Sequence, residues 1–207
     1  MLHVNNWKNR IVFEKQLRLN KKQLAGTYPP HWISFIRLIK RINKNLRVLD
    51  VGCGVGVYSE LCRKHLTSVS YTGIDYSDDA ITLAKSAWST NDIFITKDFN
   101  DIDANFISNY NLIHLGALLD VLPYANTALD KILKLAVEFV LISRIDIDST
   151  ESLTSYVAYE EIITYKDIHS MPVLLNTIHQ NNYQIWQIDG NNILLTKIQN
   201  DKPNRLD

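Results

Sequence analysis

Three glycines stand at positions 52, 54 and 56, directly after an apolar run that contains an acid, Asp50. Glycine has no Cβ atom, so a chain of this kind can turn tightly and bring its backbone close to a ligand. The run before the turn predicts a strand, and the residues after it predict a helix. Open α/β sheets bind ligands at this edge, outside the carboxyl ends of their strands. Residues 50–56 are therefore the first candidate for a binding site.

Two kinds of ligand suit such a turn. A dinucleotide requires a G-x-G-x-x-G pattern, and counted from Gly52 its third glycine falls at Val57, so that pattern fails. A pyrophosphate is also a poor neighbour for the carboxylate of Asp50, whereas a cationic group suits it. The turn therefore favours a positively charged ligand over a dinucleotide. A nicotinamide-dependent oxidoreductase, which would bind a dinucleotide here, is the disfavoured alternative for the function of the protein.

The segment D-V-G-C-G-V-G resembles the first motif of class I S-adenosylmethionine-dependent methyltransferases, and the resemblance extends from residue 46 to about residue 145. It implies S-adenosylmethionine as cofactor, S-adenosylhomocysteine as product, and a Rossmann-like fold. In this first motif it implies that the cofactor is bound by Asp50, Gly52, Cys53, Gly54, Gly56 and Tyr58.

Two later segments are similar to further motifs of the same family. Asp75 ends a predicted strand, where the family's acid binds both ribose hydroxyls, and Tyr76 follows it. Asp98 and Phe99 follow the next strand, where an acid binds the adenine amino group and the next residue packs on the ring. Asp101 and Asp103 are competing acids at that position.

The segment 110–120 is similar to the motif of the family's fourth strand, with Asn111 in place of a common Asp. The resemblance implies that His114, Leu115 and Gly116 line the cofactor near its sulfonium. Residues 113–122 also resemble a bacterial subgroup of methyltransferases associated with surface-polysaccharide clusters.

Methyl transfer from a sulfonium needs alignment of the reacting atoms and exclusion of water. A general base is needed only for a weakly acidic hydroxyl or a protonated amine. The candidate catalytic residues are His114, Asp120 and His31. The alternatives are a cofactor-lining or core role for His114 and a surface helix start for His31.

Aromatic residues are expected over the methyl acceptor, because the segments before and after the core strands lie above the carboxyl ends of the sheet. The predicted acceptor-binding residues are Tyr28, His31, Trp32, Tyr156 and Tyr159. Ordinary packing of loops is the alternative. We expect a small-molecule acceptor such as a sugar, a sugar nucleotide or a secondary metabolite.

The charges are unevenly distributed along the chain. Residues 1–47 hold 11 of the 22 Lys and Arg residues but a single acid, Glu14. This segment indicates either helices with solvated faces or a surface for an anionic partner. The second reading supports the alternative function, an RNA or protein methyltransferase that holds a polymer with its basic N-terminal segment.

Strands that alternate with helices predict a mainly parallel, doubly wound α/β sheet of Rossmann-like type. The last two strands are joined at Gly190 and predict an antiparallel hairpin. The resemblance to class I methyltransferases implies seven strands in the order 3-2-1-4-5-7-6. The expected strands are 46–51, 69–75, 92–96, 110–115, 138–145, 183–189 and 192–198. The expected helices are 8–25, one that starts at Pro30, 55–66, 77–88, 127–135 and 169–181, with a polar stretch over 146–166.

The 207 residues suit an N-terminal helical cap over 1–45 and one cofactor-binding domain over 46–200. No apolar run approaches the length of a membrane span, and a cytoplasmic monomer or homodimer is the default expectation. The two cysteines form no disulfide framework, and no metal site is predicted. Nucleic acid is a disfavoured partner, because no recognised binding module appears.

Overall fold

The main sheet has seven strands in the order β3-β2-β1-β4-β5-β10-β9. A computed structural model describes residues 7–88, 91–122, 124–135 and 137–198. The first five strands in that order run parallel, and β10 pairs antiparallel with both β5 and β9. The predicted fold class and strand order are confirmed. The strands are β1 (Leu46–Val51), β2 (Val69–Asp75), β3 (Ile93–Thr96), β4 (Leu112–Gly116), β5 (Phe139–Ser143), β9 (Tyr183–Asp189) and β10 (Asn192–Lys197).

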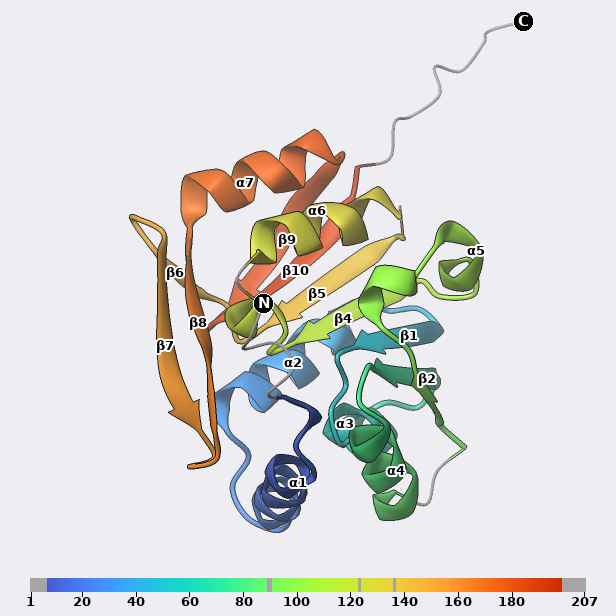
Figure 1. Ribbon diagram of the computed structural model, residues 1–207. Coiled ribbons are helices and arrows are strands. Elements are labelled where there is room, and N and C mark those ends of the chain that lie inside the picture. Colours follow the sequence, from blue (N-terminus) through green and yellow to red (C-terminus); the bar gives the residue numbers. More distant parts are fainter. Residues whose placement is uncertain (1–6, 89–90, 123, 136, 199–207) are drawn as a thin grey trace, which may run out of the picture.

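Helices cover both faces of this sheet (Figure 1). Successive side chains of a strand point to opposite faces, so Leu49 and Val51 pack in one core and Val48 packs in the other. The first core also holds α6 (Ala125–Lys134) and α7 (Met171–Gln180). The second holds α2 (Pro30–Arg41), α3 (Val57–His65) and part of α4 (Asp78–Ala87). Burial on both faces explains why these strands are almost continuously apolar.

The connections on the carboxyl side of the strands carry short helical turns. They are η2 (Phe99–Asp101) after β3 and η3 (Leu119–Val121) after β4, whereas α5 (Ala104–Ile107) lies further along the chain, before the start of β4. Asp98 begins the first of them, because its Oδ1 accepts a hydrogen bond from the Asn100 amide at 2.8 Å. These turns place side chains of several strand ends along one edge of the sheet.

A second, three-stranded sheet, for which the sequence predicted no strands, occupies most of the stretch expected to be polar. Its order is β6-β8-β7, with β6 (Asp146–Asp148), β7 (Ser152–Ala158) and β8 (Ile162–Ser170). Six of the seven residues of β7 are exposed, and polar and apolar types do not alternate along it. β7 forms because it pairs with β8, and its own sequence shows no strand periodicity from which it could be predicted.

The N-terminal helix α1 (Arg10–Ala25) lies between α4 and the second sheet (Figure 1). Val12 packs in a small core with Ala158 and Ile162 of the second sheet. Lys15 donates to the carbonyl of Tyr159 at 3.0 Å and pairs with Glu161 at 2.8 Å. These contacts join the two segments above the carboxyl edge of the main sheet. Within the described residues, no helix is long and apolar enough to cross a membrane.

Candidate active site

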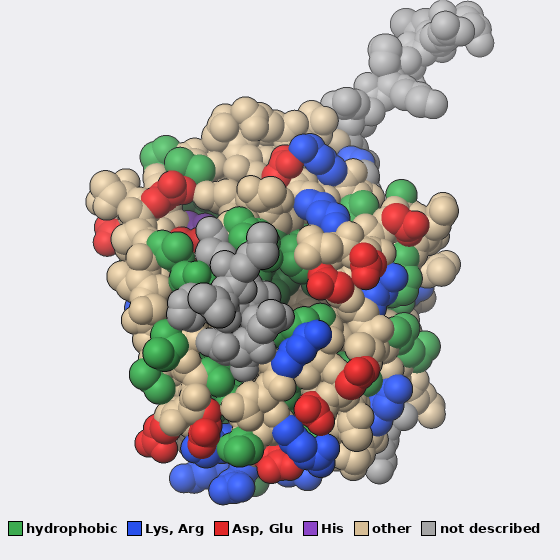
Figure 2. All heavy atoms as spheres, viewed as in Figure 1, with side chains coloured by type: hydrophobic (Ala, Val, Ile, Leu, Met, Phe, Trp, Pro, Cys, Tyr) green, Lys and Arg blue, Asp and Glu red, His purple; other side chains and the backbone are tan. Residues whose placement is uncertain are grey.

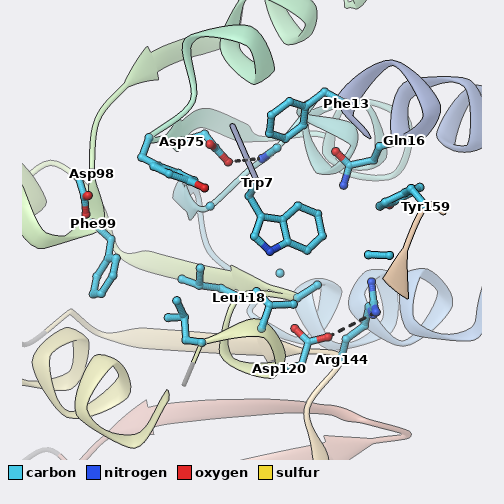
Figure 3. A pocket seen from close by; sticks show the side chains of 18 of the residues that line it. Trp7, Phe13, Gln16, Asp75, Asp98, Phe99, Leu118, Asp120, Arg144 and Tyr159 are labelled. Atoms are coloured by element: carbon cyan, nitrogen blue, oxygen red, sulfur yellow. Dashed lines mark hydrogen bonds and ion pairs between the residues drawn. The ribbon is translucent and has the colours of Figure 1, made fainter. Parts of the chain in front are cut away.

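A cavity of about 370 Å³ opens at the carboxyl edge of the main sheet. Its floor includes the turn after β1 and the ends of β2 and β4 (Figure 3). Its cover includes Trp7, Phe13 and Gln16 from the N-terminal segment and Tyr156 and Tyr159 from the second sheet. The cavity therefore lies where the sequence predicts ligand binding.

The glycine-rich turn adopts backbone angles that favour glycine. The φ angles of Gly52, Gly54 and Gly56 are +72°, +53° and +75°. Gly52 and Gly54 line the cavity, as predicted for residues that meet a ligand. A methyl group on Gly56 would lie 2.5 Å from the Phe94 ring, and Gly56 is not among the residues that line the cavity. The third glycine thus permits close packing of α3 on the sheet.

Asp75 connects the first and second predicted motifs. Its Oδ2 accepts a hydrogen bond from the Gly54 amide, and its Oδ1 accepts one from the Ser77 amide, both at 2.9 Å. Burial raises the pKa of this carboxyl to about 6, because charge is disfavoured away from water; the two amide hydrogen bonds oppose this effect. Tyr76 lies beside it and also lines the cavity.

Asp98 and Phe99 line the same cavity at the next strand end. The ammonium of Lys131 lies 5.4 Å from the centre of the Phe99 ring. Asp101 and Asp103 are exposed and do not line the cavity. The structure thus brings Asp98, and neither competing acid, together with Asp75.

Asp50 and His114 form a buried hydrogen-bonded group behind the cavity wall. The two oxygens of Asp50 interact with His114 Nδ1 at 2.7 Å and with the hydroxyl of Tyr71. The other ring nitrogen, Nε2, lies 3.0 Å from Ser143 Oγ. Both Asp50 and His114 have no exposed surface, and neither they nor Leu115 line the cavity. This placement argues against Asp50 as a direct ligand of a cation and against His114 as the base.

A smaller cavity of about 170 Å³ adjoins the larger one, and the two share Gln16, Gly52, Gly116 and Tyr159 among their lining residues. Four predicted site residues line this smaller cavity but not the larger one: His31, Trp32, Cys53 and Tyr58. Burial, followed by the positive charge of Arg144, lowers the pKa of His31 to about 4, so its imidazole is neutral at physiological pH. The predicted site residues that line a cavity are thus divided between two adjoining spaces.

Tyr28 lies apart from both cavities. Its hydroxyl is 3.3 Å from His65 Nε2, and its ring packs edge-on against Trp32. Its placement gives it a packing role rather than the predicted contact with an acceptor.

Asp120 and Arg144 face each other in the larger cavity (Figure 3). Asp120 Oδ2 lies 3.4 Å from Arg144 Nη2. Asp120 Oδ1 is buried and has no hydrogen-bond partner. Burial raises the pKa of Asp120 to about 6, although the positive charge of Arg144 opposes this effect. The pair offers one proton acceptor and one permanent cation to a ligand.

Arg144, Gln16, Trp7 and Phe13 are site residues that the sequence did not indicate. Arg144 directly follows the buried strand β5, so its place at the ligand-binding edge was a signal that could have been used. The other three lie in the N-terminal segment, and no motif marks them. Their approach to the cavity depends on the tertiary packing of α1.

Solved methyltransferases share this fold at low sequence identity. One from Clostridium acetobutylicum aligns with a TM-score of 0.63 and 10% identity over 90% of this chain and 99% of its own. Magnesium protoporphyrin IX methyltransferase of Synechocystis, with bound S-adenosylmethionine, aligns with a TM-score of 0.58 and 16% identity over 89% of this chain and 83% of its own. The sugar N-methyltransferase KedS8 of Streptoalloteichus aligns with a TM-score of 0.59 and 10% identity over 88% of this chain and 92% of its own. At such identities the likeness shows the fold alone.

Sequence comparison gives the family. Ribosomal protein L11 methyltransferase of Thermotoga neapolitana is 27% identical over 98 residues, 47% of this chain and 36% of its own length. The Dictyoglomus turgidum protein of the same name is 25% identical over 133 residues, 63% of this chain and 43% of its own. The chain spans less than half the length of these relatives. A family model described as a methyltransferase domain matches residues 42–198, so the chain belongs to the methyltransferase domain family, and the predicted methyltransferase class is confirmed.

Proposed function

We propose that the larger cavity binds S-adenosylmethionine and that the enzyme transfers its methyl group to a small-molecule acceptor. The observation that carries this proposal is the convergence of the glycine-rich turn, Asp75 and Asp98 on one cavity. Each comes from the end of a different strand, and together they match the order of groups along an aminoacyl nucleoside.

The residues present fit the cofactor. Asp75 is held by two backbone amides, which leaves further lone pairs of both oxygens for the ribose hydroxyls. Asp98 and Phe99 would hold the adenine amino group and ring. A Cβ on Gly54 would lie 2.8 Å from Gln16 Oε1, so the absence of a side chain at Gly54 leaves space for a ligand there. Gln16 Oε1 is itself buried and has no hydrogen-bond partner. The bound cofactor supplies an activated methyl group on a positively charged sulfur.

The remaining part of the larger cavity is the proposed acceptor site. Tyr156 and Tyr159 line it, and Asp120 faces it with an unpartnered oxygen. A buried acceptor atom without a partner favours a ligand that donates a hydrogen bond. We assign Asp120 the role of orienting an acceptor hydroxyl or amine and removing its proton. The cover formed by α1 and the second sheet excludes water from the reaction.

The enclosure of the site supports a small acceptor. Cations of α1 that could attract a polymer are partly engaged within the chain: Lys15 pairs with Glu161, and Arg10 pairs with Glu14 and Asp79. Figure 2 likewise shows Lys and Arg side chains gathered with Asp and Glu side chains at its lower edge, where α1 and α4 lie. A protein acceptor is the second candidate, and the similarity to ribosomal protein L11 methyltransferases is the observation that favours it.

Two experiments test the proposal. Titration calorimetry with S-adenosylmethionine, S-adenosylhomocysteine and NAD should show binding of the first two, whereas binding of NAD alone would refute the assignment of the cavity. Incubation with S-adenosylmethionine labelled in its methyl group, in a desalted cell lysate with its metabolites restored, then identifies the acceptor class. Label in the small-molecule fraction is expected, and label in protein or RNA would support the second candidate or the predicted polymer alternative.

A further inference from the structure

Arg144 has a backbone conformation that its type rarely adopts. Its φ angle is +64°, in the left-handed region that side chains other than glycine disfavour. Its amide donates to Asn192 Oδ1 at 3.0 Å, and Asn192 Nδ2 donates to the carbonyl of His31 at 2.7 Å. Asn192 has no exposed surface. A completely buried amide thus holds the strained residue to the start of α2, and strain of this kind is concentrated at functional sites.

This conformation brings Arg144 to the boundary between the two cavities, since it lines both. Among the described residues that line the smaller cavity there is no Asp or Glu, and Arg144 is the only Lys or Arg. Its guanidinium carries five N–H donors, and one ion pair, with Asp120, is formed. The smaller cavity is therefore prepared for an anionic group.

The smaller cavity also offers an acceptor for a cationic group. Gln16 lines it, and Gln16 Oε1 is buried without a hydrogen-bond partner. Asp50, the residue expected to meet a cation, is instead engaged by His114 and Tyr71. A permanent cation and an unpartnered oxygen in one small space match a zwitterion that carries both a carboxylate and an ammonium group.

We propose that the methionine end of the cofactor enters the smaller cavity. There Arg144 binds its α-carboxylate, and Gln16 Oε1 accepts a hydrogen bond from its α-ammonium group. This inference rests on the proposed function, because it requires the adenosine end to lie at Asp75 and Asp98. Gly52 and Gly116 line both cavities, so a single ligand can pass from one to the other beside them. Arg144 thereby distinguishes an intact aminoacyl nucleoside from one without a carboxylate.

The test uses the full chain and two ligands in titration calorimetry: S-adenosylhomocysteine and its decarboxylated analogue, which lacks only the α-carboxylate. The wild-type protein should bind S-adenosylhomocysteine about ten- to one-hundredfold more tightly, the range expected for a hydrogen bond between charged groups. Arg144→Gln should abolish this preference by weakening S-adenosylhomocysteine alone, and Arg144→Lys should retain part of it. Arg41→Gln, which removes an exposed arginine of α2 outside both cavities, is the control.

Each other outcome overturns a defined part of the reasoning. Equal weakening of both ligands by Arg144→Gln would make Arg144 a structural residue, and no weakening would transfer its role to the acceptor. If Arg144→Gln fails to fold, the wild-type comparison still decides, because equal affinity for the two ligands contradicts any carboxylate site. If the wild-type protein binds neither ligand, the proposed function itself fails.

Discussion

Replacing Asp75 with asparagine should separate ligand binding from folding stability. Burial raises the pKa of Asp75 from 3.8 to about 6, which corresponds to about 3 kcal/mol of unfavourable free energy once the carboxyl is ionised in the folded protein. The folded state binds the proton more tightly than the unfolded state does. The resulting stabilisation is fully present below the unfolded pKa and is lost as the pH rises through about 6.

The variant should therefore gain stability relative to the wild-type protein as the pH rises. Asparagine has a single oxygen, so one of the two amides, Gly54 or Ser77, loses its acceptor, at about 1–3 kcal/mol. That loss does not depend on pH, whereas the ionisation of Asp75 does. Between about pH 5 and about pH 8, the difference in unfolding free energy between variant and wild type should move by about 1.4 kcal/mol in favour of the variant.

Urea unfolding at the two pH values measures this change, and calorimetry at the higher pH measures affinity for S-adenosylhomocysteine. Loss of hydrogen bonds between the ribose hydroxyls and a charged oxygen should weaken binding at least about tenfold. Asp101→Asn removes an exposed acid outside the cavity and is the matched control. A variant with unchanged affinity and with the same pH dependence of stability as the wild type would refute both the assigned role and the burial argument.

Three further substitutions test separate parts of the site. Gly56→Ala should lower the unfolding free energy by about 2–4 kcal/mol, because the new methyl group meets Phe94 in a left-handed conformation; a melting temperature equal to that of the wild type would contradict this. Phe99→Ala should weaken S-adenosylhomocysteine binding about tenfold through loss of ring packing, as measured by calorimetry, and unchanged affinity would contradict its contact with the adenine. Asp120→Asn should slow methyl transfer to the acceptor found by labelling by about a hundredfold or more, and the wild-type rate should fall below about pH 6, where Asp120 becomes protonated. A rate that is insensitive to both would exclude Asp120 as the base.

The sequence by itself determined the fold and one half of the binding site. Buried parallel strands are apolar on both faces and alternate with amphipathic helices, so their order can be read locally. Gly52 and Gly54 could be identified because a left-handed turn needs glycine, and Asp75 and Asp98 because the segments that contain them resemble methyltransferase motifs.

Only the tertiary structure decided which polar groups face the ligand. Asp50 belongs to the same motif as Gly52, yet its side chain is turned inward and engaged by Tyr71 and His114 across neighbouring strands. Arg144 and Gln16 belong to no motif, and they reach the cavity because Asn192 fixes a strained backbone and α1 packs on the second sheet. Contacts between residues distant in the chain carry no local periodicity, so a sequence pattern does not contain them.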